Sequence, residues 1–110
     1  MLTNQEYRAI RRAARHIERS KKRFDFWGSA RPADINGVGC PAAWIGFFLD
    51  MPNDLYEFAA LVAKRLGFRD LLSFLQELDA IDNDWHYNNR KAAKVLRQFA
   101  DNQRSKVNVK

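Results

Sequence analysis

A chain of 110 residues, of which 46% are hydrophobic and 13% aromatic, is long enough for one domain with one core and is not an intrinsically disordered tail. No apolar run approaches the roughly 18 residues that cross a bilayer, and the charged first residues do not form a signal peptide, so we expect a cytoplasmic protein without membrane contact. The net charge of +6 is segregated: residues 1–23 and residues 88–110 each carry a net +6, whereas residues 24–87 carry a net −6.

The first segment predicts an amphipathic helix with an arginine-rich face. Thr3 and Glu6 have the spacing of a capping box, in which each side chain accepts a hydrogen bond from the other residue's backbone N–H. Apolar residues recur every three or four positions and predict the buried face: Tyr7, Ile10, Ala14 and Ile17. Basic residues recur with the same spacing on another face: Arg8, Arg12, Arg15 and Arg19. Beyond the helix, Lys22 and Arg23 extend the positive charge.

Residues 24–39 predict a long loop. The stretch "GSARPADINGVG" contains three glycines, a proline and an Asn-Gly pair, and these residue types form turns. Ile35 and Val38 are candidates for one short strand pair around that turn.

A short apolar helix is predicted to follow over residues 41–51. Pro41 suits the first helical position, Pro52 ends the helix, and the near absence of polar residues predicts a place at the centre of the core. A third helix is expected next, with Asn53 as its cap and Gly67 as its stop signal.

Two more helices are predicted from the apolar spacing, over residues 69–79 and 89–102. Residues 103–110 then form a flexible basic tail. The sequence therefore predicts an all-α fold, a compact bundle of about five helices in a single domain over residues 1–102.

Cys40, the only cysteine, lies just ahead of the helix that starts at Pro41. A thiolate is favoured at a helix N-terminus, and a catalytic thiol also needs a histidine base, for which His86 is the candidate. Free cysteine is, however, among the most buried residue types, so we favour a structural Cys40 and a protein without enzymatic activity.

No motif for a metal or a cofactor is present. The aspartates at 79, 82 and 84 do not match the calcium-loop pattern, and the two histidines and single cysteine lack the spacing of a zinc site. We therefore expect neither a metal nor a cofactor.

The basic residues at the two ends of the chain predict binding to an anionic partner. A second basic row lies in the last predicted helix: Arg90, Lys94 and Arg97. These residues suit a partner protein with an acidic surface, a nucleic-acid backbone, or the acidic middle of a second copy in a homodimer, and a merely solvated basic face is a further alternative. We favour a partner protein, because the acidic middle would repel nucleic acid and no nucleic-acid-binding motif is evident.

Two tryptophans lie in predicted connections between helices. Exposed aromatic residues of this kind anchor protein interfaces, which makes Trp27 and Trp85 candidate binding residues. We favour the alternative that they cover the helix bundle.

Four short segments, taken in order, carry a family resemblance. Trp27-Gly28 follows the first helix, a Gly-x-x-Cys turn over 37–40 precedes an apolar helix, and Asn83-Asp84 precedes a helix that contains Val95-Leu96. In this order they resemble a family of small domains of unknown function found in actinobacterial and phage genomes. The resemblance implies a phage or mobile-element setting and supplies no catalytic residues.

Our leading hypothesis is a non-enzymatic binding protein. It would be a phage accessory protein that docks on a host protein through its basic helices, for example an anti-CRISPR inhibitor of a host defence system. The alternatives are a nucleic-acid-binding protein that uses the same residues and a Cys40-dependent enzyme.

Overall fold

The computed structural model describes residues 2–19, 41–51, 58–85 and 88–108. This part of the chain contains five α-helices and no strand: α1 (Asn4–Arg19), α2 (Pro41–Phe48), α3 (Phe58–Arg65), α4 (Leu71–Ile81) and α5 (Asn89–Asn108). The predicted all-α bundle of about five helices is therefore confirmed. In the described residues, none of the helices combines the length and the apolar character needed to cross a bilayer.

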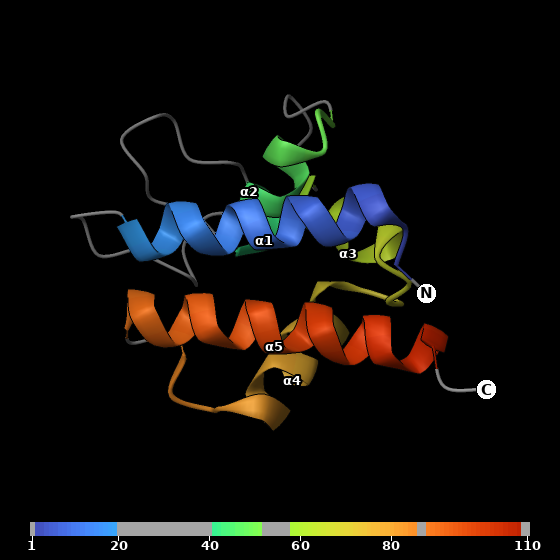
Figure 1. Cartoon of the computed structure of the whole chain (residues 1–110). Coiled ribbons are helices and arrows are strands. Elements are labelled where there is room, and N and C mark those ends of the chain that lie inside the picture. Colours follow the sequence, from blue (N-terminus) through green and yellow to red (C-terminus); the bar gives the residue numbers. More distant parts are fainter. Residues whose placement is uncertain (1, 20–40, 52–57, 86–87, 109–110) are drawn as a thin grey trace.

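The helices form a closed ring. Each helix packs on its neighbours in the chain, and α5 returns to pack on α1. Figure 1 shows α1 and α5 side by side and antiparallel, with the three shorter helices behind them. The two basic segments at opposite ends of the sequence therefore lie next to each other in one layer of the fold.

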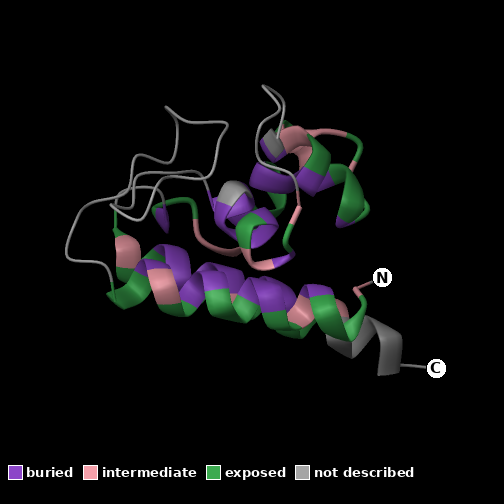
Figure 2. Cartoon of the chain, turned by 90° about the horizontal axis from the view of Figure 1, so that it is seen from above, coloured by how far each residue is buried: buried purple, intermediate pink, exposed green. Residues whose placement is uncertain are grey.

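Helix α1 begins with the predicted capping box. The Thr3 N–H donates to Glu6 Oε1 (3.2 Å), and the Glu6 N–H donates to Thr3 Oγ1 (3.1 Å). Ile10, Ala14 and Ile17 are fully buried, as their spacing predicts. Figure 2 shows this buried face of α1 turned toward the shorter helices, which form the second layer, and the exposed residues on the opposite edge.

Helix α3 ends at a glycine stop. Gly67 has a φ of +97°, a left-handed conformation that costs glycine little. The Phe68 N–H donates to the Ala63 carbonyl, and the Gly67 N–H donates to the Lys64 carbonyl. Both N···O distances are 3.0 Å, and this pair of hydrogen bonds is the Schellman pattern. The predicted stop is confirmed, whereas the predicted cap Asn53 and the predicted strand pair at Ile35 and Val38 lie outside the described residues.

Helix α4 begins two residues later than predicted, because Asp70 caps it. Asp70 Oδ1 accepts hydrogen bonds from both the backbone N–H and the hydroxyl of Ser73, and both donor–acceptor distances are 2.8 Å. The backbone hydrogen bond, the larger cause, and the hydroxyl bond hold the pKa of Asp70 below its usual value. A carboxylate that accepts N–H donors at a helix start is a favoured cap.

Helix α5 is longer than predicted. It continues to Asn108, so the prediction of a flexible tail is wrong for residues 103–108. No glycine or proline follows Asn102, and the residues beyond it include the good helix formers glutamine, arginine and lysine. Basic residues near the end of α5 are also favoured by the helix dipole.

Candidate binding surface on helices α1 and α5

A basic groove lies on the exposed side of α1 where it meets α5. It has a volume of about 490 Å³ and is lined by Tyr7, Arg8, Arg11, Arg12, Arg15 and Arg97. Five of these six residues are arginines, and none is acidic. Arginine presents five N–H donors in a planar fork that fits carboxylate and phosphate groups, so the groove has the chemistry of an anion-binding surface.

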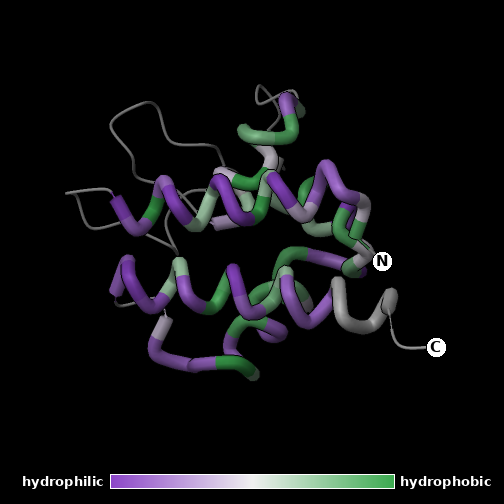
Figure 3. The backbone as a smooth tube through the Cα atoms, viewed as in Figure 1, coloured by the Kyte–Doolittle hydropathy of each residue, from purple (hydrophilic) through white to green (hydrophobic). Residues whose placement is uncertain are grey.

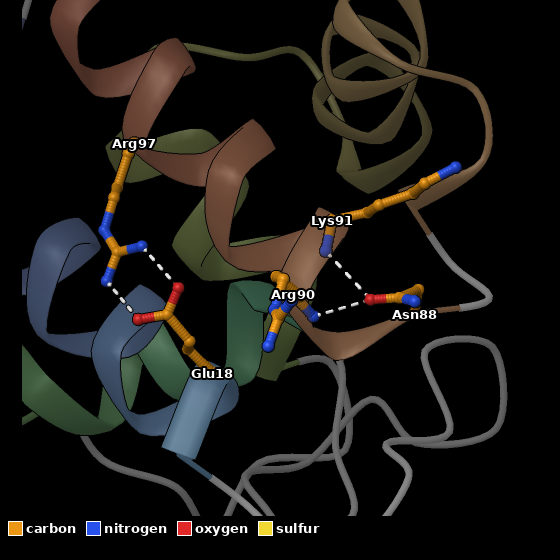
Figure 4. Close-up of polar contacts among 5 residues, drawn as sticks. All are labelled: Glu18, Asn88, Arg90, Lys91 and Arg97. Carbon is orange, nitrogen blue, oxygen red and sulfur yellow. Dashed lines mark hydrogen bonds and ion pairs between the residues drawn. The ribbon is translucent and has the colours of Figure 1, made fainter.

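One side of the groove is held by an ion pair between the two helices. Arg97 on α5 donates two hydrogen bonds to Glu18 on α1, of 2.9 and 3.1 Å (Figure 4). This hydrogen bonding is the main reason that the pKa of Glu18 is lowered and the pKa of Arg97 is raised. The bidentate geometry fixes the Arg97 guanidinium beside α1, although both side chains are partly exposed and the pair is screened by water.

The other end of the α1–α5 contact is held by a second acidic residue. The Tyr7 hydroxyl donates to Asp101 Oδ1 (2.9 Å), and Arg11 lies 3.6 Å from the same oxygen. Arg11 also donates to the Tyr7 hydroxyl over 3.3 Å. Glu18 and Asp101 therefore neutralise part of the charge of Arg97 and Arg11 and link the two antiparallel helices at both ends of α1.

Three arginines of the groove have no acidic partner among the described residues. Arg8, Arg12 and Arg15 are exposed, and none of them forms an ion pair with another described residue. Their spacing places them along about 10 Å of the helix axis. The Arg12 guanidinium lies 4.8 Å from the centre of the Phe48 ring on α2, a cation–π contact that limits its motion.

The start of α5 presents further positive charge beside the groove. Asn88 caps the helix, because its side-chain oxygen accepts the backbone N–H groups of Arg90 (2.8 Å) and Lys91 (3.1 Å) (Figure 4). Arg90 and Lys94 are exposed but do not line the groove. In total α1 and α5 carry eleven Lys/Arg and three Asp/Glu, a net +8, so the rest of the chain carries a net −2.

The structure brings most of the predicted binding residues of the two helices together. Arg8, Arg12 and Arg15 of the first predicted row line one groove, and Arg97 is the one member of the second row that joins them. Arg19 is exposed at the end of α1 but is not part of the lining. The other predictions fall outside the described residues: Lys22, Arg23, Trp27, Cys40 and His86.

Trp85 does not belong to the binding surface. Only 1% of its surface is exposed, and its Nε1–H donates to Asp79 Oδ1 over 2.7 Å. The prediction of an exposed contact residue is therefore wrong, and the alternative that this side chain belongs to the packed bundle is confirmed. The indole fits inside because its one polar group has a partner in α4.

Two groove residues were not predicted. The apolar spacing predicts Tyr7 on the buried face and the arginine row does not include Arg11, yet both residues line the groove. They are four residues apart on one edge of α1, the same edge as Glu18, and this spacing is visible in the sequence. Their contact with Asp101 cannot be seen in the sequence, because it depends on the register of α5 against α1.

No protein-family model matches the chain, and neither a curated protein nor a solved structure shows significant similarity to it. The resemblance to a phage and actinobacterial family therefore stays a prediction.

Proposed function

We propose that this chain is a binding protein whose α1/α5 face docks on an acidic surface of a partner protein. The observation that carries the proposal is the basic groove, in which Arg8, Arg12 and Arg15 are exposed and have no carboxylate partner among the described residues. A setting in a phage stays a prediction from the family resemblance, and action against a host defence system such as CRISPR stays an example of the partner that such a binding protein would have.

The charge distribution supports a role in recognition. The described basic side chains of α1 and α5 lie in one layer and repel one another, and this repulsion opposes the packing of the two helices. An acidic partner would remove this repulsion on binding, and the positive field would speed the encounter. Arginine's planar fork also favours paired contacts with carboxylates.

The positions of Glu18 and Asp101 favour a protein over a nucleic acid. Both carboxylates form contacts between the two helices, Glu18 of α1 with Arg97 and Asp101 of α5 with Tyr7, one toward each end of α1. A continuous phosphate backbone laid along this seam would meet both of them, and like charges repel. A partner protein can instead place a few carboxylates opposite Arg8, Arg12 and Arg15 and avoid the two acidic residues.

The test is a double charge reversal, Arg12→Glu with Arg15→Glu. The probe is a fluorescein-labelled glutamate-rich peptide, and its affinity is measured by fluorescence anisotropy at low ionic strength. We expect the double variant to bind the peptide roughly tenfold or more weakly, because two attractive contacts become repulsive. The effect should shrink as salt is added, since exposed charges are screened.

The matched control reverses two exposed basic residues outside the α1/α5 layer, Lys64→Glu with Arg69→Glu. This control changes the net charge by the same amount, so a loss that depends on the groove must exceed the loss in the control. Equal losses in both variants, or a wild-type protein that does not bind the peptide at low salt, would refute the proposal. A DNA duplex that binds more tightly than the peptide, with affinity falling steeply with salt, would identify a nucleic-acid-binding protein instead.

A further inference from the structure

Helix α2 exposes an aromatic side chain beside the basic groove. Phe47 is 44% exposed, although the apolar sequence predicts that α2 has almost no exposed face. That prediction fails at Phe47: among the described helices α2 packs mainly on α1 and α3, and these contacts leave the Phe47 ring partly exposed. Figure 3 shows α2 as a largely hydrophobic helix next to the hydrophilic turns of α1.

Phe47 is the exposed member of a packed aromatic group. Its ring centre lies 5.3 Å from that of Phe48 and 5.4 Å from that of Trp44, both in edge-on geometry. Trp44 is buried, and Phe48 is partly buried. A phenylalanine held on such a base loses little side-chain freedom on binding, which is the property of an interface anchor. We call Phe47 and Phe48 the aromatic ledge.

The aromatic ledge and the basic groove are continuous. Arg12 lines the groove and at the same time lies over the Phe48 ring at 4.8 Å. One turn later on α1, the His16 ring lies 4.0 Å from the Trp44 ring. Burial lowers the pKa of His16 below its usual value, which is consistent with the close packing of this ring against Trp44.

We propose that the groove and the ledge form one docking surface, and that its occupant is a segment of a partner protein in which an apolar side chain lies next to carboxylates. This inference rests on the proposed function and adds the apolar half of the site. Charge complementarity assigns the carboxylates to Arg8, Arg12 and Arg15, and the exposed ring of Phe47 then meets the apolar side chain. Arginine and aromatic residues around an apolar centre are the composition of interface hot spots.

The experiment uses two labelled peptides that differ at one position. Both are glutamate-rich; one has a leucine among the glutamates and the other has serine there. Affinities are measured by anisotropy at low and high salt, roughly 50 and 200 mM. We expect Phe47→Ala to weaken binding of the leucine peptide about fivefold at both salt concentrations, because burial of apolar surface is not screened by salt. Binding of the serine peptide should not change.

Two variants provide controls. Leu72 is 60% exposed and is the most exposed large hydrophobic side chain of the described residues. It lies on α4, which packs on α3 and α5. We therefore expect Leu72→Ala to leave the affinity for both peptides unchanged. Arg15→Gln removes a groove charge and should weaken both peptides, more at low salt than at high salt. Thermal unfolding should show a cooperatively folded Phe47→Ala protein with only a small loss of stability, because the ring is partly exposed but gives up its edge-on contacts with Trp44 and Phe48.

The inference and the proposed function fail in different ways. If Phe47→Ala leaves the affinity for the leucine peptide unchanged while Arg12→Glu with Arg15→Glu still removes it, the inference is wrong and the proposed function stands. If the wild type binds neither peptide, both are wrong. A single-stranded DNA probe that binds more tightly than the leucine peptide and loses affinity on Phe47→Ala would assign the ledge to base stacking and overturn the inference.

Discussion

Replacement of Phe99 by alanine is expected to lower the free energy of unfolding by about 3–5 kcal/mol. Only 1% of the Phe99 surface is exposed, and its ring centre lies 5.5 Å from Phe74 on α4 and 5.8 Å from Phe68 in the α3–α4 connection. The substitution removes the aromatic contact that joins α5 to the second layer and leaves a cavity. The total free energy of unfolding of a small domain is about 5–15 kcal/mol, so this loss would destabilise the fold severely.

Urea unfolding followed by circular dichroism measures this effect. The conservative variant Phe99→Leu should lose less than Phe99→Ala, because it fills most of the space. The partly exposed Phe47→Ala is the matched control and should lose only about 1 kcal/mol, from its ring contacts with Trp44 and Phe48. A Phe99→Ala protein as stable as that control would show that α5 does not pack on α4 as described.

Replacement of Trp85 by alanine is also expected to lower the free energy of unfolding by about 3–5 kcal/mol. Trp85 is buried at the end of the turn that follows α4, and its indole N–H is bonded to Asp79. The loss combines a cavity with the loss of this hydrogen bond. It is measured by the same urea unfolding.

Trp85→Phe should fall between the wild type and Trp85→Ala. It keeps an aromatic ring in the core but removes the N–H donor to Asp79 and part of the indole volume, so we expect a loss of about 2 kcal/mol. If Trp85→Ala were as stable as the wild type and instead weakened peptide binding, Trp85 would be an exposed contact residue and the buried placement would be wrong.

Local signals in the sequence predict local features of the fold well. The capping box of Thr3 and Glu6, the glycine stop at Gly67 and the buried spacing of α1 are all present in the structure. Each depends on residues within a few positions of one another, so the backbone chemistry of that segment is enough to determine it.

Features that depend on tertiary packing could not be predicted. The exposure of Phe47 follows from which sides of α2 are covered, and the burial of Trp85 from a hydrogen bond to another element. An apolar helix and an aromatic residue in a turn have the same local pattern whether or not a neighbour covers them. The length of α5 was underestimated because polar residues near a chain end are typical of both helices and tails.

The candidate site was predictable by residue type but not by arrangement. The arginine row of α1 follows from its spacing, and the second basic row from the composition of α5. The position of Arg97 in the same groove depends on its pairing with Glu18, which is 79 residues away in the sequence. Only the closure of the helix ring places the two basic ends of the chain in one surface.

The central claim is that the α1 arginines and the neighbouring aromatic ledge form one surface for an acidic partner. The most direct test is a titration of isotope-labelled protein with the glutamate-rich leucine peptide, followed by backbone amide chemical shifts in NMR. We expect saturable shift changes over residues 7–19 and at Phe47 and Phe48, and none in α4. Shift changes concentrated on α4, or no saturable change at low salt, would contradict the claim.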